Sequence, residues 1–234
     1  MTKNAATQYN PTSNRHNRLP RRDMVVLFDD FLGDTFATDS WLGAADGGAT
    51  TPAITVVAGG AVLLAAATDD DVSEFSGPIA WKPSLGGLYF ETRIQLSAIT
   101  TTAACVGLFD AAAYSATMPI TLTGTTFTTN ATSGVGIVFD TDATTDVWYG
   151  IGVKAGTDTA SVALAAPVAA TYETLGVGVD SGGTAYFYQN GDLIGSKANA
   201  VTTTTLLAPY VGLQTRVSSS RTMTCDYVLT TAAR

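Results

Sequence analysis

The sequence is poor in the residues that build helices and membrane spans. Only four of its 234 residues are Lys and three are Glu, two residue types that favour exposed helix surfaces. The longest uninterrupted apolar run is residues 61–67, which is too short to cross a bilayer, and no apolar signal core follows the N-terminal charges. These absences disfavour a helical protein and predict no membrane partner.

Histidine and cysteine are also nearly absent. The single histidine, His16, lies among N-terminal cations, and the two cysteines, Cys105 and Cys225, lie far apart in apolar segments. A serine triad needs a histidine base, and the common Cys or His metal sites need several such ligands together. We therefore expect no metal and no cofactor. The cysteines suit a cross-sheet bridge as well as free thiols, and we expect free thiols in a reducing cytoplasm.

Charge is divided unequally along the chain. Residues 1–22 contain five cations and no carboxylate: Lys3, Arg15, Arg18, Arg21 and Arg22. Seven Lys and Arg remain in residues 23–234 against all twenty Asp and Glu, so an arm of +5 precedes a body of −13. A basic, apolar-poor segment of this length cannot bury a core. We expect an extended arm at 1–22, with a tail of no consequence as the alternative, and one domain at 23–234.

Threonine and glycine are abundant, at 38 and 23 residues, and this composition favours strands separated by turns. Residues 88–96 alternate apolar and polar side chains, which predicts a half-exposed antiparallel strand. Residues 105–109, 135–139 and 147–153 are apolar runs without clean alternation, as in strands buried between two sheets. The fold class predicted is all-β, a two-sheet antiparallel sandwich of jelly-roll type over Val26 to Thr231.

The second half of the chain contains the clearest predicted unit. Residues 172–179 alternate, a turn follows at 180–183, residues 184–189 return, and Asn190-Gly191 closes a second hairpin, because both residues tolerate the positive φ of a tight turn. A three-stranded meander is expected. In the last predicted strand, one face is expected to consist of Met223, Cys225, Tyr227 and Leu229.

Two acidic clusters and one aromatic pair are candidate sites. Asp140, Asp142 and Asp146 have the oxygen-rich spacing of a calcium loop but lack its glycine and terminal glutamate, so a solvated loop is preferred. The segment 69–74 is interpreted as a charged loop that keeps the surface soluble. Tyr186 and Tyr188 share one face of a strand and are candidates for stacking on sugar rings, as an alternative to an ordinary sheet surface.

Several segments together resemble the concanavalin A-like (laminin-G-like) jelly roll, in which a strand ending in Asp leads to an aromatic strand ending in Asn-Gly. The matching segments of the second half are Tyr172–Asp180, Ala185–Gly191, Leu193–Gly195, Leu207–Gly212 and Asp226–Val228. The first half matches through Phe28–Phe31, Trp41, Gly87–Arg93 and Gly107–Asp110. The resemblance implies the fold and says little about activity.

Laminarinase-like glycosidases share this fold and place their catalytic carboxylates on one strand as Glu-x-Asp-x-x-Glu, because acid and nucleophile must flank the scissile bond. The motif is absent, and Glu74, Glu91 and Glu173 are isolated from one another. We therefore expect no catalytic residues and a protein that is not an enzyme.

The Ala-, Gly- and Thr-rich composition, together with the segments Phe139–Trp148 and Gly152–Lys154, resembles that of virion proteins of tailed bacteriophages. The resemblance implies a capsid decoration protein, made in the host cytoplasm, that binds the exterior of a phage head. Its expected partners are the major capsid protein and copies of itself, a trimer in preference to a dimer, with the arm cations as contacts. The alternative is a lectin-like adhesion module of the particle that binds glycans through Tyr186 and Tyr188. The acidic body disfavours a nucleic-acid partner.

Overall fold

The structure is a computed structural model that describes residues 23–33, 35–55, 57–114 and 117–234. The arm predicted at 1–22 lies outside the described residues, with its five candidate contacts Lys3, Arg15, Arg18, Arg21 and Arg22.

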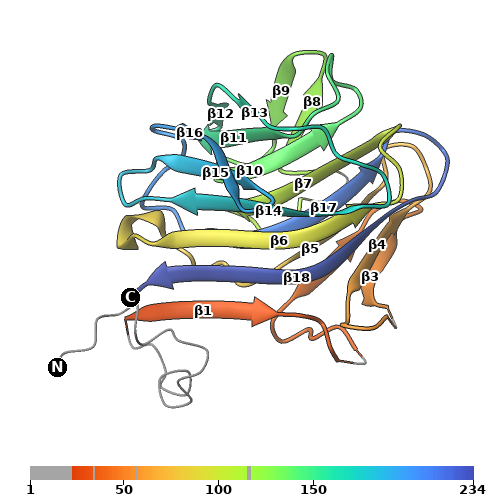
Figure 1. Cartoon of the computed structure of the whole chain (residues 1–234), viewed down its shortest axis with the longest axis horizontal. Helices are drawn as coiled ribbons and strands as arrows, with labels where there is room; N and C mark the ends of the chain where they lie inside the picture. The colour runs from red at the N-terminus through yellow and green to blue at the C-terminus, as the bar shows by residue number, and fades with distance from the viewer. Residues whose placement is uncertain (1–22, 34, 56, 115–116) are drawn as a thin grey trace.

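The described chain folds into two antiparallel sheets packed face to face, as the sequence predicts (Figure 1). Helical structure in the described residues is limited to the 3-10 turn η1 (Pro83–Leu85). Sheet A contains, in spatial order, β16 (Asp192–Lys197), β15 (Ala185–Gln189), β14 (Tyr172–Val179), β6 (Leu88–Leu96), β18 (Arg221–Ala233), β4 (Val62–Ala66) and β3 (Thr50–Ile54), with β1 (Met24–Asp29) paired to β18.

Sheet B lies behind sheet A and shares its antiparallel pairing. Its strands are β12 (Thr157–Asp158), β11 (Tyr149–Lys154), β10 (Ser133–Asp140), β7 (Thr102–Phe109), β17 (Ala208–Thr215), β5 (Val72–Ser76) and β2 (Leu42–Ala45), with β13 (Val162–Ala163) paired to β11. A separate hairpin joins β8 (Ile120–Thr123) to β9 (Thr126–Thr129) and projects beside β11 (Figure 1).

The main core lies between the two sheets, where the inward rows of both meet. In β6 the apolar positions are buried and the polar ones partly exposed along the whole strand, as its alternation predicts. The meander of β14, β15 and β16 also forms as expected, with Tyr188 opposite Gly176 in the first pairing. The alternation of side chains is sufficient to predict these strands, because each has one face exposed to solvent.

Sheet B differs, because four of its strands, β5, β7, β10 and β17, are buried on both faces. Val106, Ile137 and Val211 point into the main core, whereas Cys105, Val138 and Tyr210 belong to a second cluster on the outer face. Met118 and Ile120 from the segment leading into the β8–β9 hairpin cover that second cluster. The non-alternating apolar runs therefore indicate strands with two buried faces. Sheet A covers one face, and the segment of the β8–β9 hairpin covers the other.

A β-bulge in β18 corrects one prediction. Cys225 pairs with Ile94 and Tyr227 with Arg93, so Asp226 is an extra residue in the strand. Met223 and Cys225 are buried, as predicted, but Tyr227 and Leu229 lie on the opposite, outer face. The expectation that all four share one face is wrong, because the bulge reverses the parity of the strand after residue 226.

Two further findings concern the cysteines and the membrane. Cys105 and Cys225 are buried free thiols, as expected. Within the described residues, the chain has no helix with the length and apolar character needed to span a bilayer.

Candidate functional site

Both tyrosines predicted from the sequence lie on the outer face of sheet A. Tyr186 is paired with Gly178 and Tyr188 with Gly176. On the other side of β14, the same two glycines face Tyr89 and Glu91 of β6. We call this surface the tyrosine face and define it by seven residues: Tyr89, Glu91, Arg93, Tyr172, Tyr186, Tyr188 and Tyr227.

The two glycines of β14 leave the space that the tyrosine rings occupy. A Cβ at Gly176 would lie 2.8 Å from the Tyr89 hydroxyl oxygen. The ring of Tyr89 meets that of Tyr188 edge-on across this gap, with centroids 5.8 Å apart and planes at 77°. Edge-to-face packing is a favourable aromatic arrangement and fixes the orientation of both rings. The rings of Tyr89 on β6 and Tyr188 on β15 therefore meet beside Gly176 of β14.

Glu91 organises the centre of the tyrosine face. Its carboxylate accepts hydrogen bonds from the hydroxyl groups of Tyr89, at 2.5 Å, and Tyr227, at 2.7 Å. Burial, followed by the hydrogen bond to Glu91, raises the pKa of both phenols well above the usual range. Both tyrosines are therefore neutral at physiological pH, with their rings held in place by one acid.

A second polar group lies at the end of the face. Arg93 forms an ion pair with Asp226 at 2.6 Å, and its guanidinium carbon lies 4.2 Å from the centroid of the Tyr172 ring. The side chains of Arg93 and Asp226 are 42% and 26% exposed, so their remaining hydrogen-bonding capacity faces solvent. At the β1 side, Phe28 is 56% exposed and packs against Tyr227, with centroids 6.1 Å apart.

The three glutamates lie in three different parts of the fold. Glu91 belongs to the tyrosine face. Glu74 is buried on the outer face of sheet B, where its carboxylate accepts a hydrogen bond of 2.7 Å from the Tyr210 hydroxyl. Glu173 is buried on β14 facing the sandwich interior and accepts a hydrogen bond of 2.8 Å from the Trp148 indole. No two of them share a face, so none of these pairs can flank a single glycosidic bond.

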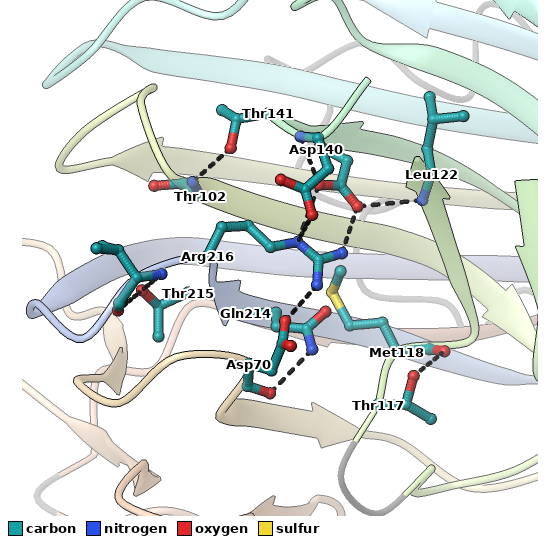
Figure 2. Close-up of polar contacts among 12 residues, drawn as sticks. Asp70, Thr102, Thr117, Met118, Leu122, Asp140, Thr141, Gln214, Thr215 and Arg216 are labelled. Carbon is teal, nitrogen blue, oxygen red and sulfur yellow. Dashed lines mark hydrogen bonds and ion pairs between the residues drawn. The ribbon is translucent and has the colours of Figure 1, made fainter. Parts of the chain in front are cut away.

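The two acidic clusters predicted from the sequence meet around one arginine, Arg216 (Figure 2). Its guanidinium binds both oxygens of Asp140, at 2.5 and 3.0 Å, and one oxygen of Asp70, at 2.6 Å. Asp142 lies 3.4 Å from the same group. The interpretation of both segments as solvated loops is therefore wrong in part: Asp140 and Glu74 are buried, and the cation beside Asp140 is a guanidinium. Within the described residues, no group of three or more His, Cys, Asp or Glu side chains is arranged so that it could hold a metal ion.

No protein family and no curated protein sequence matches this chain. Solved structures do match it. The Emp47p carbohydrate recognition domain superposes with a TM-score of 0.62 at 8% identity, covering 90% of this chain and 97% of that one. The beta-glucanase of Bacillus licheniformis superposes with a TM-score of 0.60 at 12% identity, covering 88% of this chain and 97% of that one. A beta-1,3-glucanase from Mycobacterium marinum superposes with a TM-score of 0.59 at 12% identity, covering 87% of this chain and 97% of that one. The fold is a concanavalin A-like jelly roll.

These comparisons contradict the expectation that the chain is not an enzyme. Two of the three structures are glucanases, and they share the fold over nearly nine-tenths of this chain. The expectation rests on a missing motif and a distant histidine. Those two features exclude two particular arrangements of catalytic groups, and the same fold can carry other arrangements. At 8–12% identity the likeness establishes the fold alone. None of the three is a virion protein, so the virion part of the resemblance stays a prediction.

Proposed function

We propose that this chain is a carbohydrate-binding jelly-roll module and that its tyrosine face is the binding surface. The observation that carries the proposal is the grouping of Tyr89, Tyr186 and Tyr188 beside the two glycines of β14, on the outer face of sheet A. A sugar ring presents a C–H face to the electron-rich face of an aromatic ring, and it presents hydroxyl groups at its edges. Tyrosine rings beside Glu91 and the Arg93–Asp226 pair match both features.

Charge restricts the class of glycan. The body carries −13, and on the tyrosine face the charge of Arg93 is offset by Glu91 and by the adjoining Asp226, with which Arg93 pairs. A polyanionic glycan would meet long-range repulsion from the body, whereas a neutral chain would not. The proposed ligand is therefore a neutral polysaccharide or oligosaccharide.

The experiment is a binding titration against a panel of neutral and acidic polysaccharides, followed by calorimetry with oligosaccharides of the best one. Tyr188→Ala should weaken binding about tenfold, because it removes one stacking ring and the edge contact that orients Tyr89. Tyr188→Phe keeps the ring and should retain binding. Leu206→Ala removes an exposed apolar side chain outside the strands and serves as the matched control.

Equal binding by Tyr188→Ala and the parent chain would place the site elsewhere. Release of reducing sugar is measured in the same incubations, because the fold is shared with glucanases. Binding with turnover and binding without turnover are then separate results.

A finer proposal concerns where the module acts. We propose that it is carried on the capsid exterior of a tailed phage, with Arg15, Arg18, Arg21 and Arg22 contacting the major capsid protein or a neighbouring copy. The support is the charge division between residues 1–22 and the acidic body. The test is the copy number of the chain in purified particles, and its absence from particles would contradict this role while leaving glycan binding unaffected.

A further inference from the structure

A pocket separate from the tyrosine face opens on the other sheet, at the free end of the β8–β9 hairpin. Its volume is about 280 Å³, and it lies between the hairpin, the loop after β10 and the start of β11. Ligand pockets for drug-sized molecules occupy about 300–1,000 Å³. This pocket therefore has room for one small ring and not for an extended chain.

The walls of the pocket are fixed by backbone contacts. Gly124, at the tip of the hairpin, receives a hydrogen bond of 2.8 Å from the Thr144 amide and donates one of 2.7 Å to the Asp142 carbonyl oxygen. Asp140 accepts a hydrogen bond of 3.1 Å from the Leu122 amide while it binds Arg216, which ties β8 to the same loop (Figure 2). The hairpin is thus joined at Leu122 and at Gly124 to the segment 140–144.

Two aromatic rings form the apolar part of the pocket. Phe127 and Tyr149 meet edge-on, with centroids 5.8 Å apart and planes at 81°. The Tyr149 hydroxyl donates to the Thr145 carbonyl oxygen at 3.3 Å, which orients its ring. Both side chains are partly exposed, so the corner between the rings is accessible.

The rest of the lining consists of Leu122, Gly124 and four residues that carry hydroxyl groups, Thr125, Thr144, Thr145 and Ser161. None of the lining side chains is charged, so an ionised ligand would lose hydration there without gaining a partner. A ligand with one apolar face and several neutral hydroxyl groups satisfies both parts of the lining.

From this lining we infer that the pocket binds a single uncharged sugar ring, in the pyranose form. The apolar face of the sugar would pack in the corner of Phe127 and Tyr149, and its hydroxyl groups would replace water on the threonine side. The site is distinct from the tyrosine face, so the inference stands or falls separately from the proposed function.

The test is a nuclear magnetic resonance titration of the full chain with methyl glucoside, methyl mannoside, methyl galactoside and N-acetylglucosamine, with glucuronate as the charged comparison. At least one neutral sugar should shift the amide signals of Gly124, Thr144 and Thr145 in a saturable way. Glucuronate should shift them at least about tenfold more weakly.

Two variants test the lining and one tests independence. Tyr149→Ala should abolish the shifts, and Thr145→Val, which removes one hydroxyl and keeps the shape, should weaken binding roughly threefold to tenfold. Tyr188→Ala, on the tyrosine face, should leave the pocket shifts unchanged. The inference is overturned if no neutral sugar shifts the pocket signals, if Thr145→Val binds as tightly as the parent, or if glucuronate binds equally well.

Discussion

The carboxylate of Asp140 and the guanidinium of Arg216, 76 residues apart in the chain, form a two-point ion pair in which the acid is completely buried. Arg93 of the tyrosine face and the adjoining Asp226 form a second pair of similar length, 2.6 Å, in which both side chains are partly exposed. The two arginines therefore allow the same interaction to be compared in two environments.

The first prediction is that Arg216→Met costs about 3–5 kcal/mol of unfolding free energy, because it leaves the buried Asp140 charge without its cationic partner. Arg93→Met should cost less than about 1 kcal/mol, because water replaces the lost partner. Denaturant unfolding of both variants measures the difference. Adding Asp140→Asn to Arg216→Met should recover part of the loss, and equal losses for the two single variants would contradict the argument.

The second prediction concerns Glu173, whose pKa is raised by burial although the Trp148 indole donates to it. Below its unfolded pKa of about 4.3 the residue is protonated in both states and costs nothing. As pH rises through the higher folded pKa, the folded state must ionise a buried group, so stability is lost. Glu173→Gln should therefore gain stability relative to the parent as pH increases from about 4 to 7. Unfolding curves at four pH values test this, and a difference that is constant with pH would contradict it.

The third prediction is that Glu91→Gln loosens the tyrosine face. After burial itself, the hydrogen bond to Glu91 is the largest cause of the raised pKa of Tyr89 and Tyr227. The variant should lower the pKa of both phenols, so that more tyrosine ionises at about pH 10–11, near the unperturbed value of ~10. Ultraviolet absorbance during alkaline titration measures it. Glycan affinity should fall about threefold to tenfold at pH 7, with the thermal midpoint little changed.

The fourth prediction compares two glycines in neighbouring sheets. A Cβ at Gly152 would lie 2.2 Å from the backbone carbonyl oxygen of Ala200, which cannot move cheaply. At Gly176 the nearest atom is the Tyr89 hydroxyl at 2.8 Å, the far end of a side chain that can shift. Gly152→Ala should therefore cost about 2 kcal/mol or more. Gly176→Ala should keep stability within about 1 kcal/mol while reducing glycan binding, because it displaces the Tyr89 ring.

Calorimetry and the polysaccharide titration together distinguish these outcomes. If Gly176→Ala bound glycans as the parent does, the packing of Tyr89 would have no part in recognition.

Part of the candidate site was predictable from local sequence. Tyr186 and Tyr188 are two residues apart in a strand, so the pleat places them on one face whatever the surrounding fold. The turn residues Asn190-Gly191 fix the hairpin that follows, because positive φ is readily adopted there, and Asn190 does have φ of 53°. The sandwich itself followed from the same short-range patterns.

What joins these strands was decided by the tertiary structure alone. Tyr227 reaches the tyrosine face only because the bulge at Asp226 reverses its side, and alternation by itself places it inward. Glu91 contacts it across 136 residues of sequence, and the buried Asp140 meets Arg216, which directly follows the distant strand β17. Local patterning predicted the strands of the meander and the shared face of Tyr186 and Tyr188, since those depend on neighbours one or two positions away. Only the folded chain decided which faces meet and which charges are buried, since those depend on pairings between distant segments.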